Sequence, residues 1–114
     1  MKNIKVTTQQ EFDSLPDSFK EETDIHILKG ATVSVKGDKK NGLVCAYVGS
    51  FVYAHGRSSV VAYEGSHVVA HAGSIVVAYA GSDVVAYAGS RVFAFVGSRV
   101  DALKGSSVDA YEGS

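Results

Sequence analysis

Cysteine is nearly absent from this sequence, and so are the signals for secretion or membrane insertion. Cys45 is the only cysteine among 114 residues, so no internal disulfide can form, and a lone thiol favours a reducing compartment. The first five residues lack the apolar core of a signal peptide, and no run approaches the ~18 apolar residues of a membrane helix. We therefore expect a cytoplasmic protein with no membrane partner.

Charge is also sparse and nearly balanced. The formal net charge is −1, and 20% of the residues are charged. A protein that binds nucleic acid usually carries a basic surface, which this composition does not provide. The composition therefore predicts no nucleic-acid partner, and the length predicts one domain.

An eight-residue repeat dominates the sequence from about residue 41 to the end. Its consensus is Gly-Ser-x-Val-x-Ala-Tyr-x, and two degenerate copies precede it, from Glu22 and Gly30. The regular copies begin at Asn41, Gly49, Arg57, Gly65, Gly73, Gly81, Gly89, Gly97 and Gly105.

Side-chain alternation separates two ways of folding such units. In a strand, the recurrent valine and alanine at positions four and six share one side. A meander of two-residue hairpins would turn every second valine row outward, whereas a solenoid stacks equal positions and buries all of them. The pattern therefore predicts an all-β solenoid with Gly-Ser corners.

The seventh position of the repeat indicates how many units make one coil. The residue types at this position differ between alternate units, and one series consists of His55, His71, Tyr87 and Leu103. We therefore expect two octads, about sixteen residues, per coil. The other series should form a structural ladder along one edge: Tyr47, Tyr63, Tyr79, Phe95 and Tyr111.

The first 21 residues are not repetitive and predict a capping segment of mixed α/β structure before the solenoid of residues 22–114. Ile4 and Val6 suggest a strand. Thr8 followed by Glu11 is a capping-box signature for a short helix that should end before Pro16. Residues Phe12, Leu15 and Phe19 should cover the first coil. The last coil has no comparable cap, which makes it a second candidate site of association.

The repeat unit resembles the octapeptide of bacterial ice-nucleation proteins, Gly-Ser-Thr-Leu-Thr-Ala-Gly-Tyr, and short octapeptide-repeat proteins of bacterial and prophage genomes. The resemblance covers residues 41–114 and implies sixteen-residue coils. Arg91 and Arg99 are similar to the arginines of the terminal coils through which ice-nucleation proteins associate. Ice-binding coils, however, carry Thr-x-Thr where this chain has pairs such as Ile75 and Val77, so ice binding is disfavoured.

No arrangement of residues in the sequence predicts catalysis, a cofactor or a metal site. His55 and His71 should be neighbours one coil apart, but no third ligand completes a set. Asp101 and Asp109 are eight residues apart, which places them on opposite sheets of a sixteen-residue coil, so they cannot flank one bond. We expect a protein that is not an enzyme.

Apolar residues at outward positions are the strongest functional signal, because solvated strands carry polar residues there. They form apolar stripes on both flat sides of the coil, which we interpret as the interaction face of a rigid, non-enzymatic scaffold that forms a homodimer or binds another protein. The alternative is a small prophage-type inhibitor or immunity protein with one host or toxin partner. The predicted face comprises Phe51, Tyr53, Val61, Val69, Ile75, Val77, Val85 and Phe93, with Arg91, Arg99 and Asp101 setting its register.

Overall fold

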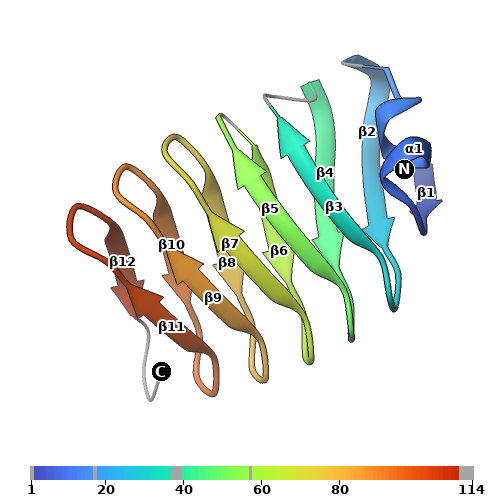
Figure 1. Cartoon of the computed structure of the whole chain (residues 1–114). Coiled ribbons are helices and arrows are strands. Elements are labelled where there is room, and N and C mark those ends of the chain that lie inside the picture. The colour runs from blue at the N-terminus through green and yellow to red at the C-terminus, as the bar shows by residue number, and fades with distance from the viewer. Residues whose placement is uncertain (1, 17, 37–39, 57, 111–114) are drawn as a thin grey trace.

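The computed structural model describes residues 2–16, 18–36, 40–56 and 58–110, and it consists of short strands wound into a rod with one helix near the amino end (Figure 1). The helix α1 spans Gln9–Asp13. The strands are β1 (Lys2–Val6), β2 (Ser18–Ile27), β3 (Thr32–Lys36), β4 (Lys40–Ala46), β5 (Phe51–His55), β6 (Ser59–Ala62), β7 (His67–Ala70), β8 (Ile75–Ala78), β9 (Asp83–Ala86), β10 (Arg91–Ala94), β11 (Arg99–Ala102) and β12 (Ser107–Ala110).

Two parallel sheets form the opposite sides of the rod. Sheet A has the order β1-β2-β4-β6-β8-β10-β12, and sheet B has the order β11-β9-β7-β5-β3. Within the array, residues sixteen positions apart are paired, so that Val76 lies between Val60 and Val92. The chain is thus a β-solenoid of about five turns with roughly sixteen residues per coil, as the repeat predicted.

Valine and alanine fill most of the interior because they occupy the inward positions of strands β5 to β12, whereas β2 buries Phe19, Thr23, Ile25 and Ile27. Val76 and Ala78 are completely buried, and their equivalents in the other central coils are exposed by 3% or less. At the described Gly-Ser corners the glycine adopts a positive φ, +80° at Gly65, and the serine after it turns inward. The Ser66 hydroxyl donates a hydrogen bond of 2.6 Å to the carbonyl of Tyr63, which satisfies a buried polar atom at the bend.

The amino-terminal segment closes the first coil, as predicted. Strand β1 pairs with β2 and forms the edge of sheet A. The helix is capped by Thr8, whose side chain accepts from the Glu11 amide, and its buried Phe12 joins the core. The Gln9 amide group accepts from the Ser34 N–H (2.6 Å) and donates to the Ser34 carbonyl (3.1 Å). Gln9 therefore replaces, for sheet B, the strand that would otherwise pair with β3.

The last described coil, unlike the first, is not covered by a capping element among the described residues. Strands β11 and β12 pair with β9 and β10, and no strand among the described residues pairs with their outer edges. Core valines Val100 and Val108 are therefore only partly buried, and Ala102 and Ala110 are exposed. Strand β2 begins at Ser18, so the first rung of the solenoid includes residues on both sides of position 22.

We predict that Gly73→Ala destabilises the fold by about 2 to 3 kcal/mol, because a side chain there meets two costs. Gly73 has φ +86°, and an added Cβ would lie 2.9 Å from the Gly56 carbonyl oxygen, a backbone atom of the neighbouring coil. Urea unfolding followed by circular dichroism measures the loss.

Gly30→Ala is the matched control, since Gly30 has φ +83° but its added Cβ would meet nothing within 4 Å. It should lose only about 1 kcal/mol, the cost of the left-handed backbone. Equal losses in the two variants would contradict the steric part of this explanation.

Candidate interaction face

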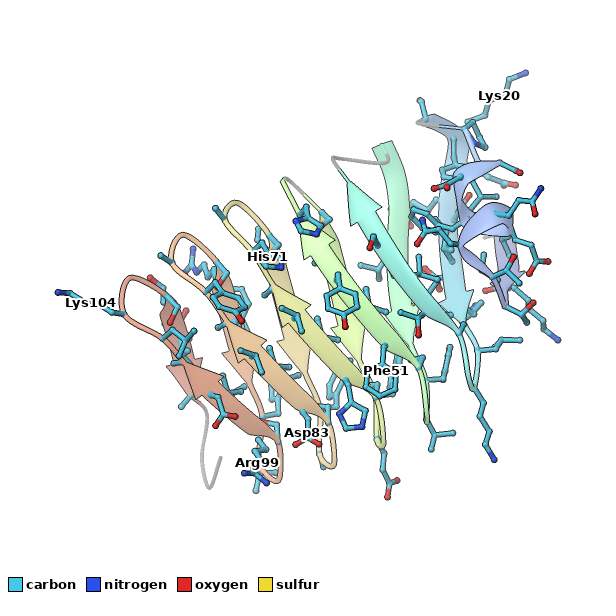
Figure 2. All side chains as sticks on the ribbon, in the orientation of Figure 1. Lys20, Phe51, His71, Asp83, Arg99 and Lys104 are labelled. Carbon is cyan, nitrogen blue, oxygen red and sulfur yellow. The ribbon has the colours of Figure 1, made fainter. Side chains whose placement is uncertain are left out.

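The predicted interaction residues are divided between the two opposite surfaces of the rod. We call the outer surface of sheet A face A and that of sheet B face B. Figure 2 is viewed toward face B and labels Phe51, His71, Asp83 and Arg99 on that side. Of the predicted set, face A carries Val61, Ile75, Val77, Arg91 and Phe93, and face B carries Phe51, Tyr53, Val69, Val85, Arg99 and Asp101.

The outward valines are less exposed than their positions suggest. Val61 is only 8% exposed, and Val69, Val77 and Val85 are half-buried. Each of them lies in a column, with a paired residue of the neighbouring coil on either side, such as Val61 and Phe93 beside Val77. Because paired strands are only about 4.8 Å apart, such neighbours cover much of one another. Among the outward residues of the strands, the exposed large hydrophobic side chains are Phe51, Tyr53 and Ile75.

A stack of aromatic rings runs along one edge of face A. The centroids of Tyr47 and Tyr63 are 5.1 Å apart, those of Tyr63 and Tyr79 5.5 Å, and those of Tyr79 and Phe95 5.2 Å. The ring planes agree within 12°. Offset stacking of this kind adds about 0.5–1.5 kcal/mol per pair and holds the rings in one orientation. Tyr111, the fifth residue expected in this ladder, is outside the described residues.

A second stack, on face B, contains the predicted neighbours His55 and His71. Their rings are 4.3 Å apart and parallel within 4°, and Tyr87 continues the stack at 5.0 Å from His71. Phe51 and His67 also stack, at 4.7 Å, and this pair was missed in the sequence. The signal was present, since any two aromatic residues sixteen positions apart in this array must face each other.

Among the described residues, the outward side chains of β6 and β8 at the centre of face A carry no charge. Strands β6 and β8 with their following tyrosines present six outward residues: Ser59, Val61, Tyr63, Ile75, Val77 and Tyr79. Four of them are exposed, namely Ser59, Tyr63 (37%), Tyr79 (41%) and Ile75 (42%).

Charged residues border this centre toward the last coil. There Arg91 pairs with Asp109 at 3.2 Å and lies over the Phe93 ring at 4.8 Å. Face B, in contrast, carries the His67–Asp83 pair (3.5 Å) among its central strands. An apolar centre with a charged border is the usual composition of a protein interface, and face A fits it better than face B does.

A polar cluster at the amino end of face A was also missed in the sequence. The Tyr47 hydroxyl lies 2.6 Å from His26 Nδ1, and His26 Nε2 lies 2.9 Å from Asn3 Oδ1. Asn3 belongs to the non-repetitive segment, so no periodic signal pointed to this contact.

Chemical groups suited to catalysis or metal binding are dispersed over the coils. In the part of the chain that the structure describes, no three His, Cys, Asp or Glu residues gather as a metal site. Asp101 lies in sheet B and Asp109 in sheet A, so they are on opposite surfaces, as the repeat predicted. No helix in the described ranges has the length and apolar character needed to cross a membrane.

Comparison with known proteins gives no relative for this chain: no family model, curated protein or solved structure matches it. The solenoid architecture is therefore established by the fold itself, and the likeness to ice-nucleation repeats stays a resemblance of the repeat unit.

We predict that Cys45 reacts slowly with thiol reagents in the folded protein. Burial, and secondarily the nearby Asp24 carboxylate, raises the pKa of its thiol from 9.0 to about 11. At pH 8 the reactive thiolate should therefore be about 100-fold scarcer than in the unfolded chain. Alkylation rates in buffer and in urea, followed by mass spectrometry, measure the ratio.

The raised pKa of Cys45 also makes the stability of the folded protein depend on pH. Folding favours the protonated thiol, so this contribution is complete below pH 9 and declines as the pH rises toward 11. Removal of the thiol by Cys45→Ala should flatten the fall in stability over that interval. Alkylation of the native protein as fast as of the unfolded chain would contradict the prediction.

Proposed function

We propose that this protein is a non-enzymatic scaffold that associates with a second copy of itself through face A. The observation that carries the proposal is the uncharged centre of that face, formed by β6, β8 and the stacked tyrosines. Tyrosine is among the residues that contribute most to protein association, and the buried centre of an interface is depleted of charge.

The dimensions of the molecule support a contact of this kind. The principal extents are 35 × 24 × 23 Å, so one broad side offers at most about 800 Å² to a partner, the usual contribution of each protein in a stable complex. A parallel sheet of closely paired strands is stiff, so little conformational entropy is lost when such a surface becomes buried.

A second copy is the partner that the charges favour. A twofold axis brings a patch against itself, which is costly when the patch carries charge of one sign. The six central residues of face A carry none, and the adjoining Arg91 and Asp109 neutralise each other. Ice binding is not proposed, because the same face has Ser59 and Val61 where ice-nucleation repeats have Thr-x-Thr.

We predict that Val77→Asp weakens self-association by at least about 100-fold, because a carboxylate would become buried in the middle of the contact. Light scattering over a dilution series measures the mass of the wild type and the variant. Circular dichroism verifies that both are folded.

Val69→Asp is the matched control, because Val69 occupies the same repeat position at the centre of face B, between Tyr53 and Val85. It should leave the mass unchanged. Equal weakening by both substitutions would contradict the assignment to face A. A wild-type monomer at every concentration would contradict self-association and favour the alternative, an inhibitor or immunity protein that uses the same face against one other protein.

A further inference from the structure

The aromatic stack on face A contains, at its amino end, a tyrosine whose hydroxyl has a base as its partner. The His26 ring lies against the Tyr47 ring, with centroids 5.3 Å apart and planes tilted by 35°. In this arrangement the Tyr47 hydroxyl lies 2.6 Å from His26 Nδ1. Imidazole is the side chain that most often accepts a proton at neutral pH. The contact therefore joins a phenol to a base that can take its proton.

A hydrogen bond on the other side of the imidazole ring sets the direction of this contact. Asn3 Oδ1 can only accept a hydrogen bond, and it lies 2.9 Å from His26 Nε2, so Nε2 carries the ring proton. His26 Nδ1 is then the unprotonated nitrogen, and the Tyr47 hydroxyl donates to it. Asn3 is a positioning residue, because it holds the imidazole in the tautomer that can receive the phenolic proton.

The next tyrosines of the same stack lack such a partner. Tyr63 and Tyr79 follow Tyr47 at ring separations of 5.1 and 5.5 Å, and both are exposed. Within the part of the chain that the structure describes, neither hydroxyl makes a hydrogen bond, which leaves solvent as the acceptor of their protons. Tyr47 is therefore chemically distinct within an otherwise regular column.

The charges around His26 favour a positive imidazolium ring. Asp24 lies two positions before His26 on the same side of β2, is half-buried, and its negative charge acts on Tyr47. Lys5 in β1 and Cys45 in β4 are paired with His26. Solvent screens the charge of the exposed Lys5, and Cys45 stays neutral because burial raises the pKa of its thiol to about 11. The less screened charge is thus the carboxylate of Asp24, which stabilises a cation.

We propose that Tyr47 is a redox-active tyrosine with His26 as its proton acceptor. An outer-sphere one-electron oxidant takes one electron from the Tyr47 ring and is itself reduced. In the same step the phenolic O–H bond breaks and an N–H bond forms at His26 Nδ1, so that a neutral tyrosyl radical faces an imidazolium. Loss of an electron makes a phenol strongly acidic, so a base already in hydrogen-bond contact accelerates the reaction. Return of the electron reverses both transfers.

The test is the rate at which the folded chain reduces photochemically generated tris(bipyridine)ruthenium(III), followed by flash photolysis. A positioned base accelerates proton transfer by about 100-fold or more, so Tyr47 should dominate the reaction. His26→Phe keeps a ring beside Tyr47 but removes the base. The total rate should then fall at least about tenfold, with the other tyrosines providing the remainder. Tyr47→Phe should lower it equally, and the double variant should be no slower than either single one.

His71→Phe is the matched control, because His71 also lies against a tyrosine. On face B (Figure 2) its ring is stacked on Tyr87 at 5.0 Å with the planes within 2°, and the described contacts include no hydrogen bond between the two side chains. His71→Phe should leave the rate unchanged, and Tyr63→Phe, which removes a phenol from the same stack as Tyr47, should change it little. Added imidazole should restore the rate of His26→Ala, which a merely structural histidine would not show.

The position of the radical gives a second readout that needs no variant to fold. High-field electron paramagnetic resonance of the oxidised wild type should show a tyrosyl radical that accepts a hydrogen bond. It should be coupled to an exchangeable deuteron in heavy water and to the labelled nitrogen of histidine. A radical without these couplings would overturn the proposal, as would an unchanged rate in His26→Phe or Tyr47→Phe, or an equal loss in His71→Phe. These readouts do not measure the mass of the protein, so they are independent of the proposed dimer.

Discussion

The pairing of residues sixteen positions apart is the constraint on which the rest of this structure depends. Each coil repeats the hydrogen bonds of the one before it at about 4.8 Å, so every side chain meets its own counterpart. This arrangement allows only residues that pack against copies of themselves in a thin interior, which is why Val76 lies between Val60 and Val92. It also requires the same corner in every coil, which glycine at positive φ and an inward serine provide.

The same constraint organises the surface into columns, so that outward residues act in rows. Stacked rings gain from this, as Tyr47, Tyr63 and Tyr79 do on face A. Polar side chains can also find a partner in the next coil, as His67 does in Asp83 and Arg91 does in Asp109. The polarity of each face therefore depends on the residues that recur in its columns. On face A, the described outward residues of the central strands β6 and β8 carry no charge.

Periodicity explains both what the sequence could predict and what it could not. Coil length, the inward valines and the two positions of Asp101 and Asp109 all follow from counting in eights. Exposure does not, because Val61 is an outward residue that its neighbours nevertheless cover. The contacts of the capping segment were also out of reach, since Gln9 meets Ser34, and Asn3 meets His26, through a fold that no repeat describes. The division of the predicted interaction residues between two faces follows from the same count, because alternate octads belong to opposite sheets.

Sites of function in such a molecule are expected where the repetition changes, because an unbroken column offers the same surface everywhere. Face A shows two such changes in the residues that border its centre. One is the replacement of apolar side chains by Asp109 in the column of Val77 and Phe93, which ends the apolar region with charge. The other is at the amino end, where the ring beside Tyr47 is that of His26, tilted by 35° and not stacked in the column. Both changes leave the pairing of the strands intact. The solenoid can therefore vary its surface residues at either end while keeping the backbone hydrogen bonds between coils.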